Sequence, residues 1–246
     1  MEPFKNFAYI YDRLLGKYAH EDWLGYFGQL VERYQITYQR AADAACGTGS
    51  VAKFWADQKL EKIFATDYSE SMLDVARKKN AGNRVRFWQQ DLINFNIPED
   101  VQLITCNFGS LNYLIRHKDL EQALAQFYIH LEQGGYLICD LHSIYYLKYR
   151  WGTMTHYLHD EDVYTVWVTS WDDQANQSTL MIDNFIKEPD GLFSHAHEIH
   201  LQKGYSLEEI LGSLQTAGFK KIEPLDLVNL KPVRPETERF LLVAQK

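Results

Sequence analysis

Three strand ends in this 246-residue chain carry residues that could bind an adenosine group. Gly47 and Gly49 form a Gly-x-Gly after an apolar run, Asp67 ends the run KIFATD, and Asp91 ends VRFWQQD. Glycine allows the positive φ and close backbone approach that a ligand-binding turn needs, and a carboxylate can accept both hydroxyls of a ribose. Since the carboxyl ends of parallel strands meet at one edge of a sheet, these residues predict an adenosine site there.

The residues around this loop help to choose between adenosine cofactors. Dinucleotide sites use Gly-x-Gly-x-x-Gly, and Ala52 stands at the last position, where alanine is a common alternative, so spacing alone leaves a nicotinamide cofactor open. Asp43 lies in the strand that leads into the loop, with no cation nearby in the sequence. A carboxylate there repels a pyrophosphate and attracts an ammonium. The loop therefore favours a cofactor with an amino acid and a sulfonium.

The elements that position these residues alternate between strand and helix. Between 40 and 142, apolar runs such as KIFATD and VQLITCNF alternate with helical segments such as SESMLDVARKKN and KDLEQALAQFYIHL. This order predicts βαβ units and a parallel sheet. Residues 20–35 have apolar groups at helical spacing and predict an amphipathic helix before the sheet.

The pattern changes between 143 and 203. YTVWVTSW, STLMIDNFIK and LFSHAHEIHLQ, joined by short polar turns, predict three antiparallel strands. A helix should then start at the capping box of Ser206 and Glu209 and end at Gly218. FKKIEPLDLV and RFLLVAQ predict two closing strands.

Composition excludes several function classes. The chain has 25 Lys and Arg against 33 Asp and Glu, a net charge of −8, and no basic run longer than three residues, so nucleic acid and anionic membranes are not expected partners. No apolar stretch approaches the roughly 18 residues that span a bilayer, and the first residues do not resemble a signal peptide. The three widely spaced cysteines form no disulfide or zinc pattern. We expect a cytoplasmic protein.

The sequence resembles the class I S-adenosylmethionine-dependent methyltransferases. Five motifs carry the resemblance in the family's order: DAACGTG at 43–49, ATDYSESML at 65–73, QQDLINF at 89–95, LITCNFGSLNYL at 103–114 and LEQGGYLICDLHS at 131–143. FAYIYDRL at 7–14 and the antiparallel insert are similar to the small-molecule branch, which includes sugar-amine N-methyltransferases and uncharacterised bacterial relatives.

The fold that the resemblance and the element order imply is α/β. We expect a Rossmann-like, seven-stranded, mostly parallel sheet with flanking helices and an inserted antiparallel β lid. The expected division is an N-terminal aromatic helical segment at 1–39, a cofactor-binding core at 40–142 and 204–246, and a substrate lid at 143–203.

The resemblance also implies a cofactor site for S-adenosylmethionine. Its expected members are Tyr11, Asp43, Ala45, Gly47, Gly49, Asp67, Tyr68, Met72, Asp91, Leu92 and Asn107. Asp67 would accept the ribose hydroxyls, Asp91 would accept from the adenine amine, and Asp43 and Asn107 would lie near the methionine end. Ala45 departs from the family, which usually has glycine there, and a positive φ at this position would strain the loop.

Methyl transfer from a sulfonium mainly requires a positioned nucleophile and exclusion of water, so the sequence says least about the catalytic group. Catalytic candidates are His142, which follows the fifth strand, and Tyr11. Substrate-binding candidates are Tyr9, Asn112, Tyr113, His142, Tyr145 and His200. His195 and His197 share a strand face, but no third ligand completes a close set, so we expect no metal.

Aromatic residues are concentrated outside the motifs. Of 35 aromatic residues, ten lie in 1–40 and eight in 143–171, which predicts two walls of an acceptor pocket. The expected function is methyl transfer to a small polar amine or hydroxyl acceptor by a monomer or homodimer. Two alternatives stay open, an RNA (tRNA) methyltransferase and a non-catalytic S-adenosylmethionine-binding protein.

Overall fold

The computed structural model describes residues 4–246, with the side chains of residues 17–22 and 24 left aside. The chain first forms α1 (Ala8–Tyr11), a π-helical turn (Asp12–Gly16) and α2 (Lys17–Arg33). The elements that follow are β1 (Arg40–Ala44), α3 (Ser50–Asp57), β2 (Lys62–Asp67), α4 (Glu70–Lys79), β3 (Val85–Gln89), β4 (Val101–Cys106), α5 (His117–Ile129), β5 (Leu131–His142), β6 (Thr155–Asp160), β7 (Val163–Asp172), β8 (Gln177–Lys187), β9 (Phe193–Lys203), α6 (Leu207–Ala217), β10 (Lys221–Asp226) and β11 (Arg239–Gln245).

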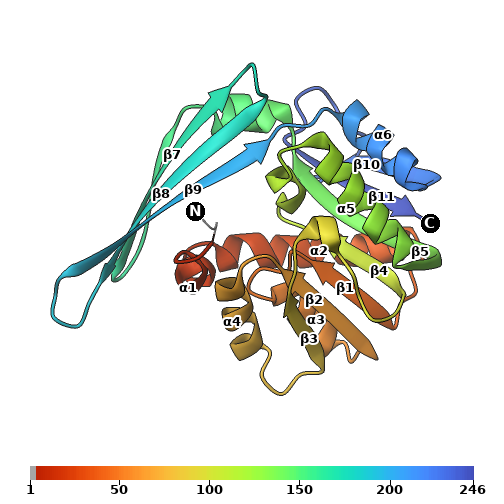
Figure 1. Ribbon diagram of the computed structural model, residues 1–246, viewed down its shortest axis with the longest axis horizontal. Helices are drawn as coiled ribbons and strands as arrows, with labels where there is room; N and C mark the ends of the chain where they lie inside the picture. Colours follow the sequence, from red (N-terminus) through yellow and green to blue (C-terminus); the bar gives the residue numbers. More distant parts are fainter. Residues whose placement is uncertain (1–3) are drawn as a thin grey trace.

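Seven strands form the central sheet in the order β10-β11-β5-β4-β1-β2-β3 (Figure 1). The inner strands pair in parallel, while β11 runs antiparallel to both β5 and β10. The predicted Rossmann-like, mostly parallel sheet is confirmed. Ser69 caps α4 by accepting a hydrogen bond from the Met72 N–H, and the predicted capping box opens α6.

The insert is a second, antiparallel sheet in the order β6-β7-β8-β9. The sequence predicted three of these strands and missed β6, so that expectation was wrong by one strand. β6 is an edge strand of alternating exposed and half-buried residues, including two histidines, and has no apolar run to reveal it. It is held by pairing with β7 and by Arg13, which forms ion pairs with Asp160 and Asp162.

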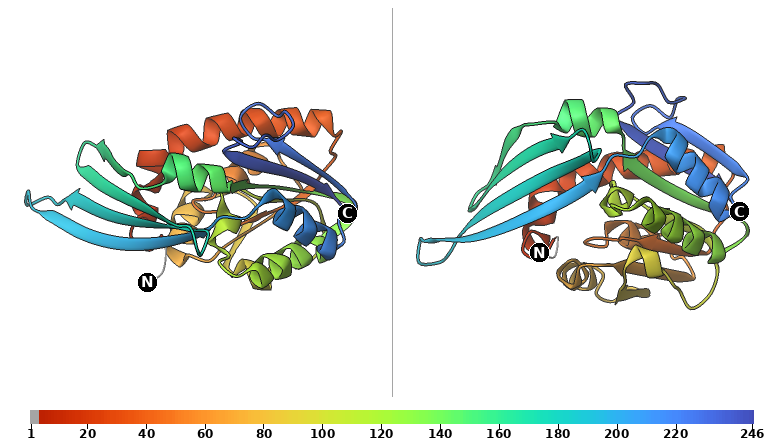
Figure 2. Two further views of the ribbon diagram at one scale, coloured as in Figure 1. Left: turned by 90° about the horizontal axis from the view of Figure 1, so that it is seen from above. Right: turned by 45° about the horizontal axis from the view of Figure 1, so that its top comes forward.

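Three apolar cores hold these layers together. On one face of the central sheet α2 and α3 bury Trp23, Phe27 and Trp55, and on the other face α5 and α6 bury Phe127 and Leu214. A third core joins the N-terminal helices to the inner face of the second sheet through Phe7, Ile10, Leu14, Val163, Trp167, Leu180 and Ile182. Figure 2 shows that sheet projecting beyond the central layers on the side where the N-terminal helices lie.

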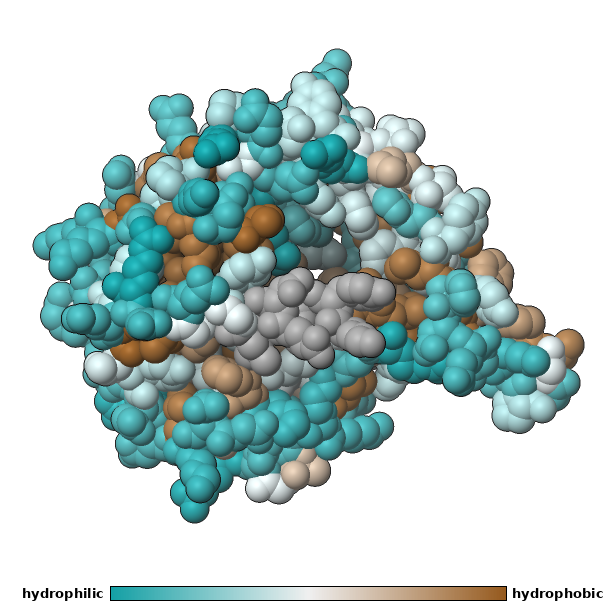
Figure 3. Space-filling model, turned by 180° about the vertical axis from the view of Figure 1, so that it is seen from behind, coloured by the Kyte–Doolittle hydropathy of each residue, from teal (hydrophilic) through white to brown (hydrophobic). Residues whose placement is uncertain are grey.

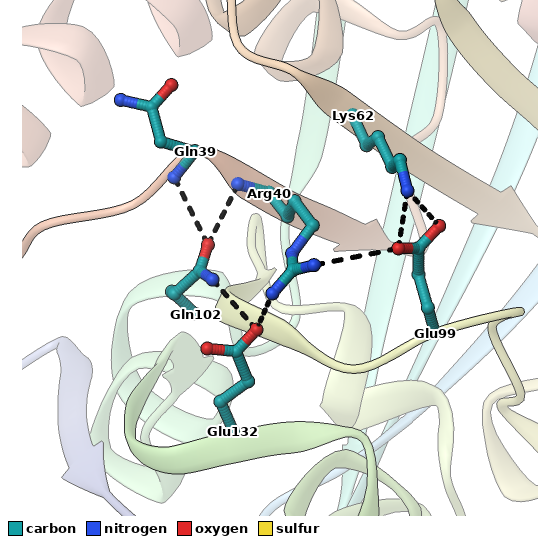
Figure 4. Close-up of polar contacts among 6 residues, drawn as sticks. All are labelled: Gln39, Arg40, Lys62, Glu99, Gln102 and Glu132. Atoms are coloured by element: carbon teal, nitrogen blue, oxygen red, sulfur yellow. Dashed lines mark hydrogen bonds and ion pairs between the residues drawn. The ribbon is translucent and has the colours of Figure 1, made fainter.

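The amino ends of the central strands are tied together by paired charges (Figure 4). Arg40 at the start of β1 contacts Glu132 of β5 and lies 3.7 Å from Glu99. Lys62 at the start of β2 contacts Glu99 at 2.6 Å. Gln102 accepts hydrogen bonds from two backbone N–H groups, at 39 and 40, and donates one to Glu132. Each of these four charges therefore has an opposite partner.

The surface mixes hydrophilic and hydrophobic side chains, as Figure 3 shows for the face behind Figure 1. The projecting sheet exposes several large apolar side chains, among them Leu192 and Phe193 in and beside the turn that joins β8 to β9. Among the described residues, no helix combines the length and the apolar character needed to cross a membrane.

Candidate active site

A cavity of about 360 Å³ lies at the carboxyl ends of β1, β2 and β3 and is closed on one side by the N-terminal segment. Its walls include nine of the residues that the sequence singled out. They are Tyr11, Ala45, Gly47, Asp67, Tyr68, Met72, Asp91, Leu92 and Tyr113. The sheet edge that was predicted from the motifs is therefore the edge that carries a cavity.

The loop after β1 contains three residues with positive φ. Ala45 has φ +56° and Gly47 has φ +53°, so Ala45 occupies the left-handed conformation that disfavours a side chain. Gly49 was predicted to contact the cofactor. It has φ +74° and lies where two helices pack closely. A Cβ there would lie 2.9 Å from the Cβ of Ala76, so the glycine lets α3 pack against α4, and Gly49 does not line the cavity.

Asp67 lies at the end of β2 and shapes the cavity floor. Its carboxylate accepts hydrogen bonds from the N–H of Gly47 at 2.8 Å and from the N–H of Ser69 at 2.9 Å. No cation contacts it among the described residues. Burial raises the pKa of Asp67 to about 6, in spite of these hydrogen bonds. The cavity thus contains a carboxylate that lacks a charged partner in the part of the chain that the structure describes.

Asp43 and Asn107 lie buried behind this loop, outside the residues that line the cavity. Oδ1 of Asp43 accepts a hydrogen bond from the Thr105 hydroxyl at 2.7 Å, and burial, reinforced by the charge of Asp67, raises the pKa of Asp43 to about 7. Among the described residues, Oδ2 of Asp43 and both polar side-chain atoms of Asn107 have no hydrogen-bond partner. These buried polar atoms fit a polar ligand group next to the loop.

The N-terminal segment brings Phe4 and Tyr11 to the cavity. Asp12, next to Tyr11, accepts a hydrogen bond from the Thr48 hydroxyl at 2.7 Å and forms an ion pair with Lys79 at 2.5 Å. Burial raises the pKa of Tyr11 to about 12, so its hydroxyl stays protonated near neutral pH. The segment is therefore fastened to the loop after β1 and supplies a neutral phenol to the site.

The turn after β4, Ser110–Tyr113, contains two predicted substrate-binding residues, of which one lines the cavity and one does not. Tyr113 lines the cavity, and its hydroxyl lies 3.0 Å from Nδ1 of His200. His200 is buried behind Tyr113 and does not line the cavity. Asn112 is also fully buried, because its side chain hydrogen-bonds the backbone of His142 and Lys203. The structure therefore places Asn112 and His200 outside the cavity lining, and their direct contact with a substrate stays a prediction.

His142, predicted as a catalytic and substrate-binding residue, also lies outside the cavity lining. Its ring stacks on Tyr146 at 4.7 Å between centroids and packs against Gly109. Burial, with a smaller effect of the Arg239 charge, lowers the pKa of His142 to about 3. A histidine with so low a pKa is a weak base, so the structure does not support it as the general base.

Two predicted tyrosines also lie away from the cavity. Tyr9 is 55% exposed on the N-terminal segment, and Tyr145 packs beside Tyr149 and Arg150. Among the described lining residues, none comes from 143–171. Of the two predicted aromatic walls, only the N-terminal one contributes to this cavity, while Trp151 and Trp167 of the other pack with the third core.

Sequence reasoning missed several residues that shape the site. Thr48, Gln90, Phe108 and Ser110 line the cavity. All four lie inside the motifs quoted above, and that position was the available signal. Asp140 is fully buried at the end of β5, accepts hydrogen bonds from the N–H groups of Phe108 and Gly109, and pairs with Arg239 at 2.8 Å. Arg239 lies 99 residues away along the chain, so no local pattern could reveal that pair.

The second sheet contains a histidine cluster outside the cavity. His195 and His197 contact the same oxygen of Asp183 at 2.7 and 2.9 Å. Within the described part of the chain, no group of three or more His, Cys, Asp or Glu side chains is arranged to hold a metal ion. The two histidines pair with a carboxylate that the sequence reasoning did not consider.

Comparisons with known proteins bear on this site. Residues 41–135 match the family described as a methyltransferase domain. The chain is 26% identical over 247 residues to a putative methyltransferase of Geobacillus sp. (strain WCH70), and the match covers 99% of each sequence.

Solved structures show the same architecture. An S-adenosylmethionine-dependent methyltransferase from Clostridium acetobutylicum has a TM-score of 0.86 and 27% identity, with 97% of each chain covered. An amino pentose methyltransferase from Micromonospora echinaspora, solved with S-adenosylmethionine bound, has a TM-score of 0.70 over 92% of this chain and 91% of its own. At 18% identity, that second likeness concerns the fold.

Proposed function

Since this chain is a class I S-adenosylmethionine-dependent methyltransferase, we propose that it methylates a small polar molecule, at an amine nitrogen, within the cavity at the carboxyl ends of β1 to β3. The observation that carries the proposal is the continuity of this cavity. One set of walls holds the strand-end carboxylates Asp67 and Asp91, and another holds Phe4, Tyr11 and Tyr113. Its volume of about 360 Å³ is in the range of small-molecule sites.

The cofactor end of the cavity fits S-adenosylmethionine. We assign the ribose hydroxyls to Asp67, whose carboxylate has spare acceptor capacity, and the adenine amine to Asp91. Tyr68, Met72 and Leu92 supply flanking surfaces for the adenine. The methionine end would lie near Ala45 and Gly47, where Asp43 and Asn107 have unpartnered polar atoms. Bound S-adenosylmethionine would supply a methyl group on a sulfonium, and the thioether released on transfer is a good leaving group.

The charge of the cavity favours an amine over an anionic acceptor. Its charged lining residues are the carboxylates of Asp67, Asp91 and Asp119 and a single guanidinium, that of Arg116. Arg116 is paired with Asp119 at 2.7 Å, which leaves the lining net negative. Such a site attracts cationic ligands and repels phosphates. The amino pentose methyltransferase from Micromonospora echinaspora, as its name states, acts on an amino sugar, which agrees with this acceptor class.

Two measurements test the proposal. Isothermal titration with S-adenosylhomocysteine tests the cofactor site, and absence of binding to folded protein would overturn it. The acceptor class is tested by incubating the protein with S-adenosylmethionine that carries a deuterated methyl group, together with a metabolite extract and defined amines that include phosphate-free amino sugars. Mass spectrometry should find the labelled methyl group on nitrogen. Labelling of a hydroxyl alone would overturn the amine assignment.

An RNA acceptor is the alternative outcome of the same assay. A parallel reaction contains total tRNA in place of the small molecules, and the net charge of −8 predicts no labelled RNA. Labelled tRNA without a labelled small molecule would replace the proposed function with RNA methylation. The variant Asp67→Asn serves as the control in both reactions, because it should lose the signal whichever acceptor is used.

A further inference from the structure

A chain of three side chains leads away from the cavity wall, from the half-buried Tyr113 to the buried His200 and Glu198. The Tyr113 hydroxyl lies 3.0 Å from Nδ1 of His200, and Nε2 of His200 lies 3.0 Å from Oε2 of Glu198. His200 and Glu198 are each 1% exposed. Both belong to β9 of the second sheet, whereas Tyr113 follows β4 of the central sheet.

Glu198 can act only as an acceptor in this chain of contacts. Its two carboxylate oxygens accept hydrogen bonds from the backbone N–H groups of Phe4 at 2.8 Å, Asn6 at 2.6 Å and Phe7 at 2.9 Å. Burial alone would raise the pKa of Glu198, but the hydrogen bonds from His200, Phe7 and Asn6 outweigh it and hold the pKa below its usual range. The side chain is therefore an ionised carboxylate, which has no proton to donate.

An acceptor at Glu198 determines which nitrogen of His200 holds the proton. Nε2 must be protonated, because it is the atom that faces the carboxylate. In the neutral ring Nδ1 is then an acceptor, and the Tyr113 hydroxyl donates to it. A phenol has one proton, so the Tyr113 oxygen keeps only acceptor capacity for its other neighbours.

The surroundings of Tyr113 agree with donation from its hydroxyl to Nδ1 of His200. Gln202 of β9 also hydrogen-bonds the Tyr113 hydroxyl, which leaves acceptor capacity for one more donor. The edge of the Phe4 ring packs on His200 at 4.6 Å between centroids. The charged group in contact with His200 is Glu198, and the titratable groups near Tyr113 are His200, Glu198 and Tyr11.

We propose that Tyr113 accepts a hydrogen bond, and then a proton, from the nucleophilic atom of the methyl acceptor, and that His200 and Glu198 are positioning residues that keep the hydroxyl proton directed away from the cavity. The inference rests on the proposed amine methylation. A proton acceptor at Tyr113 favours methyl acceptors whose reacting atom carries a hydrogen. It also gives a role to the buried carboxylate of Glu198 behind the cavity wall.

The proton can be followed through this path. When a neutral amine gains a methyl group, a carbon–nitrogen bond forms, the carbon–sulfur electron pair returns to sulfur, and the nitrogen becomes a cation with one excess proton. That N–H bond breaks and the proton passes to the Tyr113 oxygen, while Tyr113 passes its own proton to Nδ1 of His200. The resulting imidazolium is stabilised by the carboxylate of Glu198.

Glu198 also couples this path to closure of the cavity. The backbone N–H groups that it binds belong to the segment that carries Phe4, a cavity wall residue. The same carboxylate therefore holds both the N-terminal segment and the histidine. Displacement of the segment would remove three of the four hydrogen bonds that Glu198 accepts and would leave a buried carboxylate short of donors.

The tautomer of His200 is the first test, and it needs no acceptor. Protein labelled with ¹⁵N-histidine and saturated with S-adenosylhomocysteine is examined by NMR between pH 6 and 9, and the His200 signals are assigned by their loss in His200→Phe. We expect a neutral ring protonated at Nε2, with an Nδ1 resonance that shifts in Tyr113→Phe. His142 is the internal control, because its Nδ1 has no partner among the described residues and should not respond. Protonation at Nδ1, alone or with Nε2, would overturn the proposal.

A double-mutant cycle is the second test, using the acceptor identified by the labelling assay. Tyr113→Phe should lower kcat about 100-fold, as loss of an acid–base group does, and His200→Phe should act in the same direction. The double variant should be no slower than Tyr113→Phe alone. Multiplication of the two effects would show that His200 acts only through packing and would overturn its assigned role.

Two further measurements distinguish a loss of proton transfer from a loss of cofactor binding or of folding. Affinity for S-adenosylhomocysteine and the thermal midpoint, measured for every variant, identify losses of cofactor binding or of folding. If no acceptor is methylated, the proposed function fails, while the tautomer measurement still decides whether Tyr113 is oriented as described.

Discussion

The two ends of the neighbouring strands β1 and β2 differ in whether their charged side chains are paired. At the amino edge, Arg40 and Lys62 pair with Glu99 and Glu132 in partly exposed positions (Figure 4). At the carboxyl edge, Asp43 and Asp67 are buried and have only neutral hydrogen-bond donors among the described residues. Burial raises the pKa of Asp43 to about 7 and that of Asp67 to about 6.

The difference shows where the protein gives up stability for binding. A buried carboxylate without a cation destabilises the folded state, and only a ligand that supplies donors or positive charge removes that cost. Paired charges at the other edge carry no such demand. We therefore expect substitutions at the carboxyl edge to change ligand affinity and substitutions at the amino edge to change stability.

Asp67→Ala should produce the largest effect. It removes the acceptor that we assign to two ribose hydroxyls, and two charge-assisted hydrogen bonds are together worth about 3 kcal/mol or more, so the Kd for S-adenosylhomocysteine should rise about 100-fold. Isothermal titration measures the change. Asp57→Ala is the matched control, since it removes an equal charge from an exposed ion pair with Lys53 and should leave the Kd unchanged.

Arg40→Met should show the opposite behaviour. It keeps the aliphatic part of the side chain but leaves Glu132 without its cation and Glu99 with only Lys62, so the free energy of unfolding should fall by about 2 kcal/mol. Urea unfolding followed by circular dichroism measures this loss. Cofactor affinity should not change, and a weakened Kd in Arg40→Met would contradict the division between the two edges.

The pH dependence of binding should follow Asp67. Below a pH of about 6 its carboxylate becomes protonated, and the Kd for S-adenosylhomocysteine should rise about tenfold for each further pH unit. In the ligand-free protein, the raised pKa makes the ionised form unfavourable, so this group lowers stability as the pH rises from about 4 through 6. Both trends should be absent from Asp67→Asn. Equal pH dependence in the two proteins would assign the titration to another group.

Ala45→Gly should have the smallest effect. The residue has φ +56°, and glycine relieves a left-handed strain of about 1 kcal/mol or more, offset in part by the greater freedom of glycine in the unfolded chain. We expect a net gain of about 0.5 kcal/mol in unfolding free energy. Lys59→Gly, at φ +60° near the amino edge, should gain similarly. Only Ala45→Gly should also alter cofactor affinity, and equal Kd values for the two variants would contradict a cofactor contact at Ala45.

The sequence predicted the fold and the cofactor edge because both depend on local patterns. Asp67 and Asp91 follow strands directly, and the parallel arrangement of those strands brings their ends together. The capping residues of α4 and α6 were readable for the same reason, since a cap and its N–H partner lie within three residues. The edge strand β6 was missed because its alternation is mostly polar.

The acceptor side depended on contacts that no local pattern contains. Strand periodicity places a residue on a face but does not say whether that face meets a cavity or another layer, which is why His142 and Asn112 were expected in the site and are buried in packing. Glu198 carries no local signal of its role, because the backbone N–H groups that it binds lie more than 190 residues away along the chain. The sequence by itself determined which strand ends we assign to the cofactor. Only the tertiary structure, by packing the second sheet against the N-terminal segment, decided which other side chains line the cavity, because that choice depends on how separate layers are oriented against one another.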